Sequence, residues 1–221
     1  MPLRVIGDVH AQIDFSLTRG RASYLEIIDG CSCSIQIGDM GDAEAYDALV
    51  EHVDPTKHRF FGGNHDHYPF VPSHHLGDFG FHSMGGVDFF FVRGAKSSDK
   101  KKLLETGERL GKTLWYPEEE LPVSMHDSII ESYLEIKPSL VLTHTCPSSI
   151  RPIVVDHLRR RSRFPMSVSN STSDTANLLQ MMLECHQPDV WCFGHYHRDF
   201  GYRDDKTHFR CIGELSYFDI E

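Results

Sequence analysis

Five short segments of the sequence combine Asp, His and Asn at spacings that could bind metal ions. They are Asp8-Val9-His10, Gly38-Asp39-Met40-Gly41-Asp42, Gly63-Asn64-His65-Asp66, Thr143-His144 and Gly194-His195-Tyr196-His197. Together they offer carboxylates, an amide oxygen and imidazoles, but no thiolate. Such a donor set suits Mn, Fe, Zn or a similar divalent ion. It suffices for two ions if one carboxylate bridges them, and paired ions of this kind hydrolyse phosphate esters.

Each segment comes at the end of an apolar run that predicts a strand. The runs are 3–7, 33–38, 58–63, 139–144 and 189–195. Helical patterns separate the first three, and this alternation predicts a largely parallel sheet with right-handed crossovers. The carboxyl ends of such strands border one crevice, so residues distant in sequence can meet there. Each pair alone, such as Asp8-x-His10, is commonplace; their joint occurrence favours a site.

The rest of the chain predicts further elements of a single domain over 1–221. Apolar runs at 79–84 and 87–94 flank Gly85-Gly86 and predict a β-hairpin. Further predictions are helices over 124–138 and 174–188 and strands over 206–214 and 215–221. The charged segment 97–102 reads as a turn, and 151–174 reads as an irregular, mobile surface insertion.

Composition excludes several classes of function. The chain has 221 residues and a net charge of −10 with histidines neutral, which argues against stable nucleic-acid binding. No run approaches the roughly 18 apolar residues of a membrane span. None of the six cysteines forms a CxxC pair, so a zinc ribbon has no support. The start of the chain does not read as a signal peptide, so we expect a cytoplasmic protein; a homo-oligomer stays open.

In order, the five segments match D-x-H, G-D-x-x-D, G-N-H-[DE], a lone H and G-H-x-H, and so the chain resembles the calcineurin-like metallophosphoesterase superfamily. The match runs from Asp8 to His197. The resemblance implies an α/β fold, a four-layer α-β-β-α sandwich with two mixed β-sheets face to face and helices outside. It also implies a first ion held by Asp8, His10, Asp39 and His197, and a second held by Asp39, Asn64, His144 and His195.

The same resemblance implies roles for the two residues after Asn64. His65 would protonate the leaving oxygen without binding a metal, and Asp66 would orient its imidazole. Metal coordination lowers the pKa of water from about 15.7 toward roughly 7, so metal-bound hydroxide would attack phosphorus. Two divalent ions are expected, Mn first, with Fe, Zn, Ni or Mg as alternatives.

Departures from subfamily patterns narrow the substrate. Phosphoprotein phosphatases of this superfamily carry G-D-x-V-D-R-G, whereas this chain has GDMGDAE and lacks the arginine. We therefore expect a bacterial- or phage-type phosphodiesterase or phosphomonoesterase acting on small, nucleotide-type phosphate esters. A phosphoprotein phosphatase and a catalytically silent binding scaffold of the same fold are the alternatives. Candidate substrate-binding residues are Arg93, Arg159, Arg160 and Arg161, for which edge packing or a solvated helix end is the competing interpretation.

Overall fold

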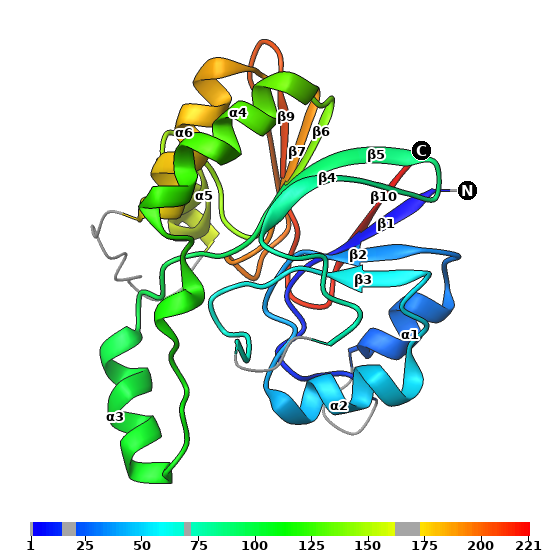
Figure 1. Ribbon diagram of the computed structural model, residues 1–221, viewed down its shortest axis with the longest axis vertical. Helices are drawn as coiled ribbons and strands as arrows, with labels where there is room; N and C mark the ends of the chain where they lie inside the picture. Colours follow the sequence, from blue (N-terminus) through cyan, green and yellow to red (C-terminus); the bar gives the residue numbers. More distant parts are fainter. Residues whose placement is uncertain (1, 15–20, 69–71, 162–172) are drawn as a thin grey trace.

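The structure is a computed structural model that describes residues 2–14, 21–68, 72–161 and 173–221. Two β-sheets pack face to face, and helices cover the outer side of each (Figure 1). The four-stranded sheet has the order β10-β1-β2-β3, and the six-stranded sheet has the order β4-β5-β6-β7-β9-β8. Both contain parallel and antiparallel pairs. The predicted four-layer α-β-β-α sandwich is confirmed.

The four-stranded sheet is built mainly from the N-terminal part of the chain. Its elements are β1 (Leu3–Ile6), α1 (Tyr24–Asp29), β2 (Ser34–Gln36), α2 (Ala43–His52), β3 (His58–Phe60) and β10 (Tyr217–Ile220). Ser23 and Glu26 form a reciprocal capping box that starts α1, and the Asp42 side chain caps α2. β1, β2 and β3 are parallel, so the loops that follow them leave the same edge of the sheet.

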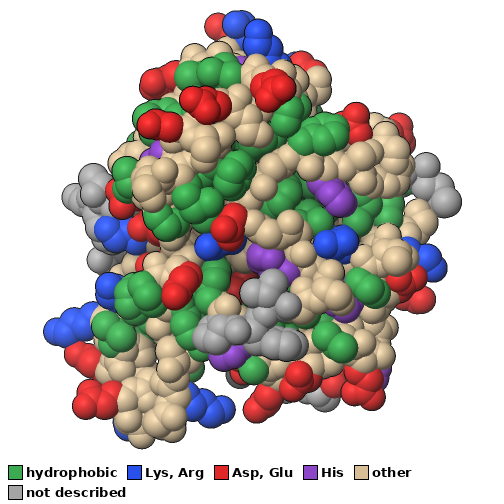
Figure 2. Space-filling model, viewed as in Figure 1, with side chains coloured by type: hydrophobic (Ala, Val, Ile, Leu, Met, Phe, Trp, Pro, Cys, Tyr) green, Lys and Arg blue, Asp and Glu red, His purple; other side chains and the backbone are tan. Residues whose placement is uncertain are grey.

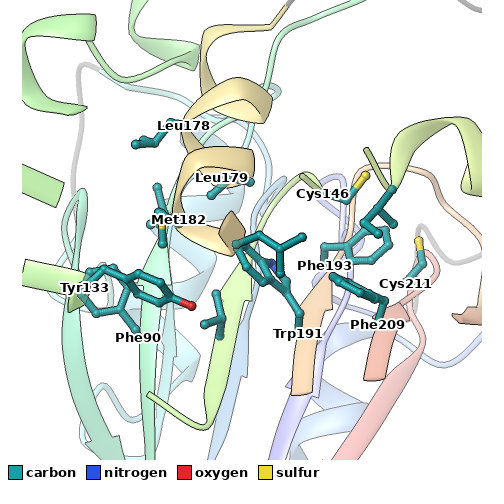
Figure 3. Packing of buried hydrophobic residues seen from close by; sticks show 14 of the residues in the cluster. Phe90, Tyr133, Cys146, Leu178, Leu179, Met182, Trp191, Phe193, Phe209 and Cys211 are labelled. Carbon is teal, nitrogen blue, oxygen red and sulfur yellow. The ribbon is translucent and has the colours of Figure 1, made fainter. Parts of the chain in front are cut away.

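The six-stranded sheet contains the predicted hairpin, since β4 and β5 pair antiparallel across Gly85-Gly86. Its elements are β4 (Phe79–Met84), β5 (Val87–Val92), β6 (Leu140–Thr143), β7 (Val190–Phe193), β8 (Phe200–Arg203) and β9 (His208–Cys211), with α4 (His126–Ile136), α5 (Arg151–Arg161) and α6 (Asp174–Cys185). Apolar side chains of α6 pack on Trp191 and its neighbours from the strands (Figure 3). β5, β6, β7 and β9 are parallel.

A separate apolar cluster holds the two sheets together. It is formed by inward side chains of both sheets, including Val5 and Ile35 from the first and Leu142 from the second. The rings of Phe61 and Phe91 stack across this interface, with centroids 5.4 Å apart. The sandwich core therefore fixes how the strand ends of one sheet face those of the other.

Three local predictions need correction. Residues 151–161 form α5 because Val154 and Leu158 pack into the core at helical spacing; the remainder of the predicted irregular insertion, 162–172, lies outside the described residues. Segment 97–102 is partly helical, since α3 (Lys100–Leu110) begins inside it and projects from the body (Figure 1). β8 was not predicted.

Two short 3-10 helices, η2 (Pro117–Glu119) and η3 (Val123–Met125), connect α3 to α4. In the described ranges, no helix has both the length and the apolar character needed to cross a membrane.

Candidate metal centre

Two fully buried carboxylates lie just beyond the ends of β1 and β2. Asp8 and Asp39 are each 0% exposed. Asp8 Oδ1 accepts the backbone N–H of His195 at 3.0 Å, and Asp39 Oδ1 accepts that of His65 at 2.8 Å. Among the described residues, neither Oδ2 atom has a hydrogen-bond partner. A buried ionised oxygen without a partner is costly, so these two atoms have the character of metal ligands.

Imidazoles converge on the two free carboxylate oxygens. His197 Nε2 lies 3.1 Å from Asp8 Oδ2 and 3.0 Å from His10 Nε2. His10 Nε2 is also 3.8 Å from Asp39 Oδ2. Ligand atoms of Asp8, His10, Asp39 and His197 all lie within 4.8 Å of one another. The structure thus brings together the four residues predicted for the first ion.

A second group of donors lies on the other side of Asp39. Asn64 Oδ1 is 3.1 Å from His144 Nε2 and 2.8 Å from His195 Nδ1. Asp39 Oδ1 is 3.2 Å from the same His144 nitrogen. His144 Nδ1 lies 2.9 Å from the Ile37 carbonyl oxygen, and donation to it leaves Nε2 free to bind a metal. Asp39 therefore contacts both groups, as a bridging carboxylate would.

The backbone is strained at several of these residues. His10, Asp39, His195 and His197 all have positive φ, at 49°, 60°, 69° and 55°. Such conformations are unfavourable for residues other than Gly, and they are concentrated at functional sites. Gly38, with φ of 103°, allows a close approach, because a Cβ there would lie 2.3 Å from His144 Nδ1. The tightly packed cluster of donors is therefore accompanied by local backbone strain.

Charges within the cluster act strongly on one another. Burial disfavours the protonated form of His144, but the charge and hydrogen bond of Asp39, together with the charge of Asp8 and the Ile37 carbonyl, raise the pKa of His144 to about 9. Burial, followed by the charge of His144, lowers the pKa of His195 to about 3. Burial also disfavours ionised Asp39, yet His144 holds its pKa well below the ordinary range. The two ionised carboxylates need a positive charge beside them, which a proton or a metal cation supplies.

The comparison with known families agrees with this geometry. The model of the calcineurin-like phosphoesterase family matches residues 1–199. This chain belongs to that family. The family is metal-dependent, and the Asp and His cluster of the chain could hold a metal ion. A comparison with curated protein sequences finds no match.

One solved structure shows the same fold at low sequence identity, and two others are reported as similar. The chain is similar to the protein TT1561 of Thermus thermophilus, with 14% identity, a TM-score of 0.52, and coverage of 97% of this chain and 90% of that one. The phosphopantetheinyl hydrolase of Mycobacterium tuberculosis matches at 12% identity, a TM-score of 0.48 and coverage of 97% and 90%. A candidate 5′-nucleotidase from Staphylococcus aureus matches at 14% identity and a TM-score of 0.45. The match covers 97% of this chain but only 49% of that protein.

Asp66 forms hydrogen bonds with the backbone of two loops. Its two oxygens accept backbone N–H groups from Asp39 at 2.8 Å, Gly41 at 3.0 Å and Gly63 at 2.6 Å. None of these bonds involves the His65 imidazole, so they give no support to the prediction that Asp66 orients it, which stays a prediction. Asp66 joins the loop after β2 to the loop after β3. The His65 ring itself lies 5.6 Å from the His10 ring, beside the cluster.

Of the arginines predicted to bind substrate, Arg93 and Arg160 form ion pairs and Arg159 is exposed. Arg93 is buried, and its guanidinium donates to Asp78 Oδ1 at 2.5 Å and to the Glu118 carbonyl at 2.6 Å, which favours a structural role. Arg159 and Arg160 are exposed on α5, where Arg160 pairs with Asp156 at 2.7 Å. They occupy the end of α5 farther along the chain from His144, roughly 12–15 Å along the axis from Arg151. The side chain of Arg161 lies outside the described residues.

Sequence reasoning missed one residue that touches a predicted ligand. Asn64 Nδ2 donates to Ser97 Oγ at 3.1 Å, and both side chains are buried. Ser97 lies beyond the end of β5, the same kind of position as the predicted ligands. It could have been found by that rule, but the charged residues after it made the segment read as a solvated turn.

Proposed function

We propose that this protein is a phosphoesterase that uses two divalent ions to hydrolyse small phosphate monoesters or diesters. The observation that carries the proposal is the pair of buried, unpartnered oxygens, Asp8 Oδ2 and Asp39 Oδ2, ringed by imidazoles. Family membership supports the same conclusion. Bound ions would supply Lewis acidity toward phosphoryl oxygens and an activated water as nucleophile.

The proposed roles of the site residues follow from how exposed each side chain is. Asp8 and Asp39 lie at the bottom of the site and hold the ions, with the proposed ligand sets as given by the sequence motifs. The side chains of His10 and His197 are 25% and 45% exposed, so a phosphate group can reach this edge from solvent. His65 lies beside His10 and does not contact the unpartnered carboxylate oxygens, which suits a group that donates a proton to the leaving oxygen.

A small substrate is proposed over a polymeric one. The net charge of −10 opposes broad contact with a polyanion. On the face shown in Figure 2, the Lys and Arg side chains drawn in colour are scattered among acidic ones and form no continuous basic surface. Mn is the proposed metal, with Fe, Zn, Ni or Mg as alternatives, and a cytoplasmic location is proposed. A nucleotide-type ester is the proposed substrate class.

The test begins with protein stripped of metal by a chelator. Addition of Mn²⁺ should restore two bound ions per chain and hydrolysis of p-nitrophenyl phosphate, bis-p-nitrophenyl phosphate or both. The preferred compound would distinguish a phosphomonoesterase from a phosphodiesterase. A chain that binds two ions but hydrolyses neither compound would contradict the proposal and favour a binding scaffold.

A further inference from the structure

The orientation of the Asn64 side chain decides whether it can bind a metal. An amide has an oxygen that can coordinate a cation and an NH₂ group that cannot. In the structure Asn64 Oδ1 faces His144 and His195, and Nδ2 faces away toward Ser97 Oγ, 3.1 Å distant. Rotation by half a turn about the last bond would place NH₂ among the imidazoles. Some contact must therefore favour one orientation over the other.

Ser97 alone does not fix this choice. A serine hydroxyl can donate or accept, so it could pair with either end of the amide. Ser97 is 5% exposed and Asn64 is 2% exposed, so water has little access to the hydroxyl and does not orient it. The direction of the Ser97 O–H bond depends on a further partner.

Glu119 is the candidate for that partner. Its side chain is 4% exposed, and its carboxylate lies beside the Ser97 hydroxyl and the Trp115 indole. Burial raises the pKa of Glu119, while the O–H of Ser97 and the N–H of Trp115 act to lower it. The backbone fixes this segment as well, because Ala95 N–H donates to the Glu119 carbonyl at 3.0 Å. Among the described residues, Glu119 Oε2 has no hydrogen-bond partner, so the carboxylate can accept a hydrogen bond from the Ser97 hydroxyl.

We propose that Ser97 and Glu119 are positioning residues that hold the Asn64 amide with its oxygen toward the second metal. An ionised carboxylate only accepts hydrogen bonds, so Ser97 directs its O–H to Glu119. The Ser97 lone pair is then left for Asn64 Nδ2, and Asn64 Oδ1 must face His144 and His195. This inference rests on the proposed two-ion phosphoesterase function, but it concerns residues that no sequence motif includes.

The experiment measures Mn²⁺ binding by calorimetry, with wild type, S97A and the matched control S98A. Ser98 is the exposed neighbour of Ser97, so S98A should bind as wild type does. S97A should bind one ion normally and the other about 10- to 100-fold more weakly, as is typical for residues that support a ligand. S97T keeps the hydroxyl and should restore the weaker site. E119Q removes the acceptor-only partner and should also weaken that site, by less than S97A.

The outcomes separate this inference from the proposed function. If S97A binds both Mn²⁺ ions with unchanged dissociation constants, the positioning role of Ser97 is overturned. If E119Q leaves the dissociation constant of the weaker site unchanged, the positioning role of Glu119 is overturned. A merely structural role would lower the melting temperature of metal-free S97A and weaken both sites alike. If S97A does not fold, E119Q carries the test, and S97T serves as the variant that keeps the hydroxyl. Wild type that binds no ion would overturn the proposed function and this inference together.

Discussion

The two sheets make different contributions to the ligand cluster. The loops after β1, β2 and β3 supply the fully buried carboxylates Asp8 and Asp39 together with Asn64. The loops after β6 and β7 supply imidazoles, namely His144, His195 and His197. Negative charge is thus concentrated in one half of the sandwich, and nitrogen donors come mainly from the other.

This difference teaches that the candidate site is a property of the interface between sheets. Hydrogen bonds cross it directly, as from the His195 N–H to Asp8 Oδ1 and between His144 Nδ1 and the Ile37 carbonyl. Each of the two proposed ligand sets takes donors from both halves, since His197 joins Asp8 and Asp39 while His144 joins Asn64. The apolar cluster between the sheets therefore determines the geometry of the site, although it contacts no substrate.

The largest effect is expected at the carboxylate that both ligand groups share. Asp39→Asn should remove most bound metal and abolish hydrolysis, a greater loss than the roughly 10- to 100-fold typical of residues outside the ligand shell. Metal analysis and turnover of the aryl phosphates would measure it. Asp42→Asn is the matched control, because Asn also caps helices well and Asp42 caps α2. Full turnover by Asp39→Asn would refute the assignment of the site.

His65 and Asp66 are neighbours in sequence but should behave differently. His65→Ala should lower kcat by about 10²- to 10⁴-fold with metal content unchanged, since it removes a general acid. Asp66→Ala should lower the free energy of unfolding by several kcal/mol, because buried backbone N–H groups without partners cost about 1–3 kcal/mol each. Urea unfolding and steady-state kinetics would separate the two. An Asp66→Ala variant with native stability and the kinetics of His65→Ala would support the orienting role.

The interface between the sheets can be weakened without touching a ligand. Phe91→Ala should lower the free energy of unfolding by about 3–5 kcal/mol, the usual cost of a buried Phe. Metal affinity should fall with it, because the imidazole half would lose its fixed position. Phe81, 48% exposed on neighbouring β4, is the control, and Phe81→Ala should change stability by about 0.5 kcal/mol or less. Unchanged metal affinity in a destabilised Phe91→Ala would show that the halves position their donors independently.

The smallest expected effect is the pH dependence of stability in metal-free protein, where protonated His144 lies beside Asp39. The pKa of His144 is raised from 6.5 to about 9, so its contribution to stability is complete below pH 6.5 and is lost as pH rises through 9. At about 1.4 kcal/mol per unit, the loss is about 3 kcal/mol. His195, with its pKa lowered to about 3, acts oppositely; its contribution is present above pH 6.5 and is lost as pH falls toward 3.

Urea midpoints across pH 5 to 9 would test this profile in chelator-treated protein. His144→Asn should remove the alkaline decline and lessen the loss on the acid side, because the charge of His144 contributes to the lowered pKa of His195. An alkaline decline that persists in this variant would assign it to other groups. Mn²⁺ should reverse the trend in wild type, because binding requires neutral His144 and grows stronger as the proton is lost.

Much of the site could be predicted from the sequence because its ligands follow strands that local patterns reveal. Asp8, Asp39 and His144 each come after a short apolar run, and parallel strands end at a common edge. In contrast, α3 and α5 were not predicted, because local patterns did not reveal them. In α3 Gly107 is the only buried residue, so this helix lacks the apolar side that a sequence pattern can reveal, and in α5 the arginines at 159–161 outweighed the apolar residues before them.

The sequence by itself determined which donors the chain carries and the order in which the strands present them. Only the tertiary structure decided the partner of each atom. Asp66 could have bonded the adjacent imidazole, but its oxygens accept N–H groups, two of which, Asp39 and Gly41, lie more than twenty residues away. Ser97 acquired its contact with Asn64 in the same way, across 33 residues. A buried polar group bonds whatever the packed sheets bring near it, and sequence spacing carries no record of that choice.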